Sequence, residues 1–229
     1  MRFRKAVLII HGFAGGTYDQ EFLANYLELD RLLDVYTFTL PGHDSYTRAK
    51  VTKEDWINSA EDHLKMLIKN GYNKIYVIGH SMGGVIATYV ASKHKEVKKL
   101  VLVAPAFKFL SFSDGTVNVI EIIKQAPELI KTYNSDEILS RILKLPIRTV
   151  SEFIELVKQY HDSTSDIRIP TLIIQGLNDS IVPVDSSKYV YDTIKSKKKK
   201  ILYFENTTHD VFRGNTKETI SMEIKKFLR

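Results

Sequence analysis

The chain has 229 residues, of which 44% are hydrophobic and 26% are charged. This length and composition indicate a soluble, globular protein with one domain and a sizeable core. The sequence has no cysteine, which excludes a disulfide framework and a thiolate metal site and fits a reducing compartment.

The basic residues do not indicate a nucleic-acid or membrane protein. The formal net charge of +6 is modest, and part of it comes from the KSKKKK run at residues 195–200. Such runs can contact nucleic acid or anionic lipid. No aromatic residue or nucleic-acid motif is interleaved with this one, so we expect a solvated approach to the next strand. The apolar run at residues 6–10 is too short for a secretion signal or a membrane span. We therefore expect a cytoplasmic protein with no nucleic-acid partner and no stable membrane insertion.

Strand-like and helix-like segments alternate along most of the chain. Continuous apolar runs are typical of strands that are buried on both faces of a parallel sheet. The sequence predicts strands at residues 7–10, 34–40, 74–78, 99–103, 171–175 and 200–204. It predicts helices at residues 20–29, 52–70, 85–91, 184–194 and 220–228, and a capping box starts the second of these at Thr52. This order indicates an α/β fold, with a mostly parallel sheet and helices on both faces.

The alternation stops between about residues 107 and 167. This stretch holds apolar-periodic segments and two prolines but no strong strand. The segments lie at residues 117–126, 128–133, 137–143 and 150–160. We expect a small helical cap insertion within a single domain over residues 1–229, rather than a second domain with its own large core.

The most informative stretch is Gly79-His80-Ser81-Met82-Gly83-Gly84, which follows a predicted strand and precedes a predicted helix. A G-x-S-x-G pattern in this setting is typical of a nucleophile elbow, where a tight turn holds the serine hydroxyl out at the end of the strand. The flanking glycines leave no side chain to clash where helix and strand cross. The alternative is a glycine-rich turn that only packs.

A serine becomes a good nucleophile only with a base to take its proton and an acid to orient that base. Asp179 and His209 follow two successive predicted strands, and they come after Ser81 in the order acid, then histidine. Asp210 is the alternative acid, but side chains of adjacent residues seldom meet in the required geometry. Of the other histidines, His80 is expected to pack or to orient the elbow.

The loop after the first strand completes the candidate site. A tetrahedral intermediate needs N–H donors, and the backbone N–H of Met82 is the first of them. We expect the second from Phe13, with Gly12 keeping the backbone approachable and His11 shaping the loop by hydrogen bonds. The alternative is a plain turn. The glycines here match no nucleotide-binding motif.

The sequence resembles the α/β-hydrolase superfamily, and within it small bacterial carboxylesterases and monoacylglycerol-lipase-like serine hydrolases. The matching motifs span nearly the whole chain outside the insertion: H-G-F-A-G at residues 11–15, L-P-G-H at 40–43, the elbow, N-D-S-I-V-P at 178–183, and His209. The resemblance implies Ser81, Asp179 and His209 as a triad, and the N–H groups of Phe13 and Met82 as an oxyanion hole. Two departures stand out. Asp44 replaces the last glycine of the usual L-P-G-H-G motif, and the sequence predicts none of the antiparallel strands that often precede the first strand, so we expect a reduced sheet.

We therefore expect a serine esterase that forms an acyl-enzyme, requires no cofactor or metal, and takes short- to medium-chain acyl esters or monoacylglycerols as small-molecule substrates. A thioesterase or an amidase or peptidase would use the same residues. A catalytically silent fold that binds a small ligand is the alternative from another class, but it would not require an intact triad and oxyanion loop.

Overall fold

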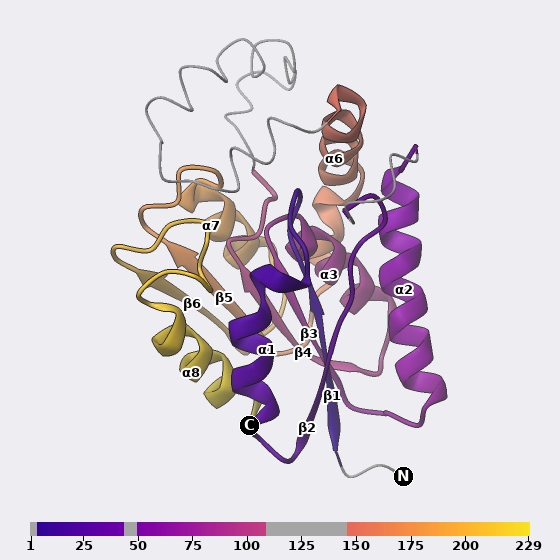
Figure 1. Cartoon of the computed structure of the whole chain (residues 1–229), viewed down its shortest axis with the longest axis vertical. Helices are drawn as coiled ribbons and strands as arrows, with labels where there is room; N and C mark the ends of the chain where they lie inside the picture. The colour runs from indigo at the N-terminus through magenta and orange to yellow at the C-terminus, as the bar shows by residue number, and fades with distance from the viewer. Residues whose placement is uncertain (1–3, 44–49, 109–145) are drawn as a thin grey trace.

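The computed structural model describes residues 4–43, 50–108 and 146–229. Through the middle of the described part runs a six-stranded sheet with the strand order β2-β1-β3-β4-β5-β6 (Figure 1). The strands are β1 (Lys5–Ile10), β2 (Leu33–Thr37), β3 (Ile75–His80), β4 (Val97–Val103), β5 (Thr171–Gly176) and β6 (Lys199–Phe204). Each neighbouring pair is parallel, which confirms the sheet predicted from the apolar runs.

Helices cover both faces of the sheet, as the sequence predicts (Figure 1). The face that packs against α1 (Glu21–Glu28) and α8 (Lys217–Leu228) includes Val7 and Ile9 of β1. Leu8 and Ile10 of the same strand face the opposite layer, because successive side chains of a strand point to opposite faces. That layer contains α2 (Lys53–Lys69), α3 (Met82–Lys93), α6 (Ile147–Tyr160) and α7 (Val184–Thr193).

The predicted start of α2 is confirmed. The Thr52 side chain accepts from the backbone N–H of Asp55, and the Asp55 carboxylate accepts from the N–H of Thr52 at 2.8 Å. This reciprocal pair is a capping box. Trp56 then points into the core with no exposed surface, and its ring N–H donates to the Pro41 carbonyl at 3.0 Å.

Several element boundaries differ from the sequence prediction, and the end of β2 and the start of α3 differ for a clear structural reason. The second strand was expected over residues 34–40, but β2 ends at Thr37. The N–H of Leu40 donates instead to the ring of His11, so the end of this segment is tied to a loop and not to a strand ladder. The third helix was expected at residue 85, but α3 begins at Met82, directly after Ser81, because the elbow passes into the helix without a spacer.

The predicted insertion is described only in part. The segments at residues 117–126, 128–133 and 137–143 lie outside the described residues, as does Asp44. The segment predicted at residues 150–160 is helix α6, which begins three residues earlier, directly after Pro146. It continues into the 3₁₀ helix η2 (His161–Asp166) before β5. Among residues 4–43, 50–108 and 146–229, no helix is long and apolar enough to span a bilayer.

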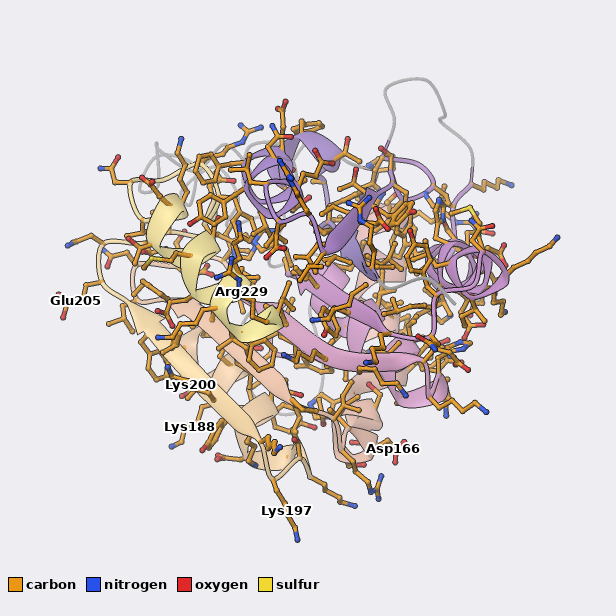
Figure 2. The ribbon with its side chains drawn as sticks, turned by 90° about the horizontal axis from the view of Figure 1, so that it is seen from below. Asp166, Lys188, Lys197, Lys200, Glu205 and Arg229 are labelled. Atoms are coloured by element: carbon orange, nitrogen blue, oxygen red, sulfur yellow. The ribbon has the colours of Figure 1, made fainter. Side chains whose placement is uncertain are left out.

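The lysine run leads into β6. Lys195, Lys197, Lys198 and Lys200 are exposed, and Figure 2 shows Lys197 pointing away from the ribbon at the edge of the molecule. Lys199 is half-buried, and its ammonium group donates to the carbonyls of Tyr191 and Ile194 at the end of α7, where a cation complements the helix dipole.

Candidate active site

Ser81 lies at the junction of β3 and α3 with φ 55° and ψ −120°. A positive φ is uncommon for a residue other than glycine and persists only where the surroundings enforce it. Here the Ser81 N–H donates to the Val103 carbonyl at 2.9 Å, and the Ser81 carbonyl accepts from Gly84 and Ala106. The turn therefore has the strained geometry that the elbow pattern predicts.

Two glycines of the elbow are required by close backbone approaches. A Cβ at Gly79 would lie 2.2 Å from the carbonyl oxygen of Gly83, and a Cβ at Gly83 would lie 2.3 Å from that of Ile10. Both separations are far shorter than a van der Waals contact, and the obstructing atoms are backbone. Any larger residue at either position would push α3 away from the ends of β1 and β3.

Asp179 and His209, which are 30 residues apart in sequence, meet in the structure. Their side chains are 0% and 1% exposed, and His209 Nδ1 lies 2.8 Å from Asp179 Oδ2. The other carboxylate oxygen, Oδ1, accepts from the N–H groups of Ile181 and Val182 at 2.9 and 2.8 Å. Burial raises the pKa of Asp179, but the attraction and hydrogen bond of His209 and the two backbone donors outweigh it, so this pKa lies below its usual value.

His80 connects the elbow to the loop that carries His209. Its Nε2 lies 3.0 Å from the backbone carbonyl of His209, and its Nδ1 lies 3.4 Å from the side-chain amide nitrogen of Gln20. A carbonyl only accepts, so Nε2 carries the proton and Nδ1 accepts from Gln20. Burial, with a smaller contribution from His209, lowers the pKa of His80 to about 3. The ring is therefore a neutral hydrogen-bonding link between the elbow and the His209 loop.

His11 has a similar role in the loop after β1. Its Nε2 accepts from the N–H of Leu40 at 2.9 Å, so Nδ1 carries the proton and donates to the Gly12 carbonyl at 2.8 Å. Burial and the nearby His43 lower the pKa of His11 to about 4. This neutral ring joins the loop after β1 to the segment after β2.

The loop after β1 lies directly against Ser81. A Cβ at Gly12 would come within 2.9 Å of the Cβ of Ser81, so the backbone at Gly12 and Phe13 passes beside the serine. Met82 is the first residue of α3, where the leading N–H groups have no acceptor within the helix. Both backbone N–H groups that the sequence predicts as oxyanion donors thus belong to segments that border Ser81.

Phe153 is a neighbour of this loop that sequence reasoning did not single out. It belongs to α6, and its ring stacks on that of Phe13 with a centroid separation of 4.9 Å. Trp56 packs edge-on against Phe13 at 6.0 Å. The apolar stripe at residues 150–160 was the available signal, but a stripe alone does not reveal which face it covers.

The candidate residues gather at one edge of the sheet. Ser81, Asp179 and His209 follow the carboxyl ends of β3, β5 and β6, and Gly12 follows β1. The chain leaves β1 toward β2 on one side and later returns to β3 on the other. Ligands of open α/β sheets bind outside such a switch point. In the described part of the chain, no group of three or more His, Cys, Asp or Glu side chains could hold a metal ion.

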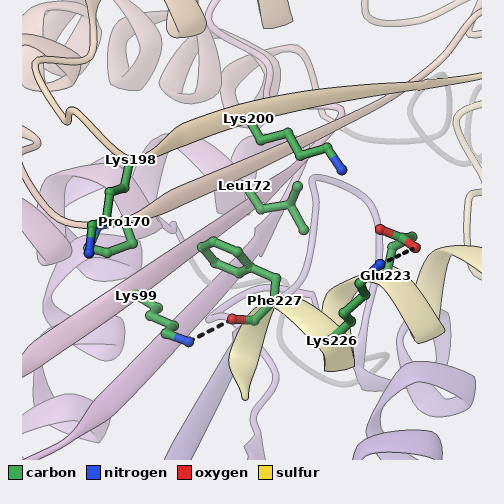
Figure 3. Close-up of a pocket in the computed structure, with 8 residues that line it drawn as sticks. All are labelled: Lys99, Pro170, Leu172, Lys198, Lys200, Glu223, Lys226 and Phe227. Carbon is green, nitrogen blue, oxygen red and sulfur yellow. Dashed lines mark hydrogen bonds and ion pairs between the residues drawn. The ribbon is translucent and has the colours of Figure 1, made fainter.

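A separate pocket of about 450 Å³ lies at the opposite end of the strands (Figure 3). Lys99, Leu172 and Lys200 line it from the amino-terminal halves of β4, β5 and β6, and Phe227 lines it from α8. The Lys99 ammonium donates to the Phe227 carbonyl at 2.7 Å. This pocket does not belong to the candidate site, because that site lies beyond the carboxyl ends of the strands.

Comparisons with known proteins agree with this geometry. A family model described as serine aminopeptidase, S33, matches residues 2–216. A carboxylesterase of Bacillus subtilis (strain 168) is 24% identical over 98% of this chain and 92% of its own length. A thermostable monoacylglycerol lipase of Bacillus sp. (strain H-257) is 25% identical over 89% and 82% of the two chains. A solved structure of a metagenome-derived lipolytic enzyme superposes with a TM-score of 0.79 at 22% identity, over 99% and 94% of the two chains.

These matches confirm the fold class and the resemblance that the motifs indicate. The names of the relatives are consistent with the expectation that the protein is a carboxylic ester hydrolase. The family model matches residues 2–216, and the solved structure covers 99% of the chain. The chain therefore has the α/β-hydrolase fold and belongs to the serine aminopeptidase, S33, family.

Proposed function

We propose that this protein hydrolyses carboxylic esters through a covalent acyl-enzyme, with Ser81 as nucleophile, His209 as base and Asp179 as the orienting acid. The observation that carries the proposal is the buried pair of His209 and Asp179, 2.8 Å apart, at the same edge of the sheet as a serine with a strained backbone. His80, adjacent to that serine, is hydrogen-bonded to the backbone of His209. The elbow and the base are therefore joined by a direct contact.

The residues act in a defined order. The Oγ of Ser81 attacks the ester carbonyl carbon while Nε2 of His209 takes its proton. The backbone N–H groups of Phe13 and Met82 hold the oxyanion. His209 then gives the proton to the leaving alcohol, the C–O bond breaks, and an acyl group remains on Ser81. Water attacks this acyl group with His209 again as base, which releases the carboxylic acid.

The bond from Asp179 fixes the tautomer of the base. Because Asp179 accepts from Nδ1 of His209, Nε2 is left without a hydrogen and can take the serine proton. The pKa of Asp179 lies below its usual value, so the carboxylate stays ionised and stabilises the imidazolium that forms.

In this proposal, the predicted cap determines which acyl chains the site accepts. Helix α6 belongs to the stretch that the sequence predicts as a helical cap, at about residues 107–167 of a single domain, and it brings Phe153 onto Phe13, beside the proposed oxyanion donor. An aromatic wall at that point favours a short or medium acyl chain, or the acyl chain of a monoacylglycerol, held beside the serine. The names of the relatives, a carboxylesterase and a monoacylglycerol lipase, support this substrate class.

The test combines a covalent probe with a matched pair of serine variants. A fluorophosphonate should label the wild type at Ser81, and Ser81→Ala should lose both labelling and ester hydrolysis, on the order of 10⁶-fold as in a known triad. Ser92→Ala is the control, because it removes a hydroxyl at the far end of α3 that only bonds the Tyr89 carbonyl. Near-wild-type turnover by Ser81→Ala would refute the mechanism. A folded wild type that never labels would favour a ligand-binding role.

The description of the matching family suggests a second candidate activity. Serine aminopeptidase, S33, names peptide-bond cleavage, which uses the same acyl-transfer residues. Parallel panels of p-nitrophenyl esters, thioesters and aminoacyl anilides separate the alternatives. We expect the highest kcat/KM for esters, and a higher value for an anilide would reassign the substrate class.

A further inference from the structure

Gln175 is a polar side chain in an otherwise apolar strand. It lies near the end of β5, in the sequence Thr-Leu-Ile-Ile-Gln-Gly, with no exposed surface. Buried polar groups are costly unless hydrogen-bonded. Its partners therefore indicate what the residue does.

The amide nitrogen of Gln175 faces three acceptors. Nε2 lies 3.2 Å from Asp179 Oδ2, 3.2 Å from the Val182 carbonyl and 3.1 Å from the Gly176 carbonyl. The amide oxygen accepts from the Ser187 hydroxyl of α7 at 2.7 Å. A reversed amide would place its oxygen against three acceptors, so the orientation of the group is fixed.

The contact with Asp179 involves the oxygen that matters for the base. Oδ2 accepts from Gln175 and also from Nδ1 of His209, 2.8 Å away. Oδ1 is held separately by two backbone N–H groups. Gln175 is thus the side-chain donor that shares one carboxylate oxygen with the imidazole.

We propose that Gln175 is a positioning residue: its amide, anchored by Ser187, holds Asp179 Oδ2 in line with His209 and takes up part of the charge of that oxygen. This inference rests on the proposed function, because it concerns how strongly the acid acts on the base. Gln175 acts through Asp179 and does not touch the reacting atoms.

The proposal predicts the direction of a pH effect. Without the amide donor, the full charge of Oδ2 acts on the imidazole, which favours its protonated form. The pKa of His209 should therefore rise, and the acidic limb of kcat/KM should move to higher pH.

Other titratable groups near His209 do not reverse this direction. His80 packs against the ring at a centroid separation of 4.9 Å, but burial holds its pKa at about 3 and keeps it neutral. Beyond it, Asp19 is paired with Arg213 at 3.1 Å. These groups are unchanged by a substitution at Gln175, so they contribute equally to wild type and variant.

The main variant is Gln175→Met, which keeps an unbranched side chain of similar length but removes the donor. We expect the midpoint of the acidic limb of kcat/KM to shift to higher pH by about 0.5 unit or more. We also expect kcat to fall about 10-fold, because the base is less well aligned, with KM changed less than about twofold because no substrate contact is lost. A folded variant with the wild-type acidic limb would overturn the proposal.

Two serines in the first turn of α7 provide a matched pair. Ser187→Ala releases the amide oxygen of Gln175 and should move the acidic limb in the same direction by a smaller amount. Ser186→Ala also removes one buried hydroxyl, but that hydroxyl donates to the Pro105 carbonyl and accepts from the N–H of Lys108. Neither partner contacts Gln175, so the limb should stay in place. If Gln175→Met does not fold, the two serine variants provide the test. The same midpoint of the acidic limb of kcat/KM in Ser187→Ala and Ser186→Ala would overturn the proposal.

A spectroscopic titration separates this proposal from the proposed function. With ¹⁵N-labelled histidine, the His209 signals can be assigned by their loss in His209→Gln and then titrated in each protein. An increase in the pKa of His209 in Gln175→Met supports the positioning role even if the wild type hydrolyses no ester. An unchanged titration contradicts it even if Ser81 labels as expected.

Discussion

Two buried neutral histidines should make this fold sensitive to mild acid. The pKa values of His11 and His80 are lowered to about 4 and about 3, mainly by burial. In the unfolded chain both would titrate near ~6.5. Between these values the unfolded state binds more protons than the folded state, so stability falls as the pH is lowered. Their contribution is fully present above pH ~6.5 and is lost progressively toward pH about 4 for His11 and about 3 for His80.

The size of the effect follows from the width of that pH interval. Each histidine should contribute a slope of up to about 1.4 kcal/mol per pH unit, or about 2.7 kcal/mol for the pair. Lowering the pH from 7 to 4.5 should therefore cost about 5 kcal/mol, a large part of the 5–15 kcal/mol that is typical of a folded domain. The pKa of Asp179 is lowered, so its stabilisation is lost as the pH falls from the usual carboxylate pKa, near ~3.9, toward the lowered one. Nearly all of that loss lies below pH 4.5 and adds little to this interval.

The assay is urea unfolding at pH 7, 6, 5 and 4.5, followed by the fluorescence of Trp56, the single tryptophan, which is fully buried. His80→Gln removes one titration while keeping an amide that can donate, so the slope between pH 6 and 4.5 should fall by about half. His161→Gln is the control, because that side chain is 36% exposed. A free energy of unfolding that is flat from pH 6.5 to 4.5, or an unchanged slope in His80→Gln, would refute the reasoning.

Further predictions concern catalysis. Asp179→Asn should reduce kcat by about 10⁴-fold by favouring the wrong imidazole tautomer, and a larger loss in Asp210→Asn than in Asp179→Asn would reverse the choice of acid. The rate of p-nitrophenyl ester hydrolysis should rise with pH as His209 loses its proton, because only the neutral imidazole can take the serine proton; a rate independent of pH between roughly 5 and 8 would contradict a histidine base. Gly12→Ala should lower kcat about 10-fold or more, because its Cβ would come within 2.9 Å of Ser81, whereas unchanged kinetics would mean that the loop can move aside. Across p-nitrophenyl esters, kcat/KM should be highest for short or medium acyl chains, and a maximum at the longest chain with a rate jump on emulsified triglyceride would indicate a true lipase.

The sequence by itself determined the layered architecture and the candidate nucleophile. Apolar runs and helical stripes reflect the side-chain periods of strands and helices, which are local properties. The elbow at Ser81 is equally local, because its glycines and its strained turn lie within a few residues of one another. Asp179 and His209 could be chosen because parallel strands bring the loops at their carboxyl ends to one edge.

Tertiary structure alone decided how these loops are held together. His80 bonds the His209 carbonyl across 129 residues, and His11 bonds Leu40 across 29. Gln175 shares the Asp179 oxygen with His209, and Phe153 stacks on Phe13. A sequence pattern shows that a side chain is polar or apolar, but its partner depends on which segments the fold brings within about 3 Å. A hydrogen bond is directional and short-ranged, so these links follow from the packed backbone and not from any local period.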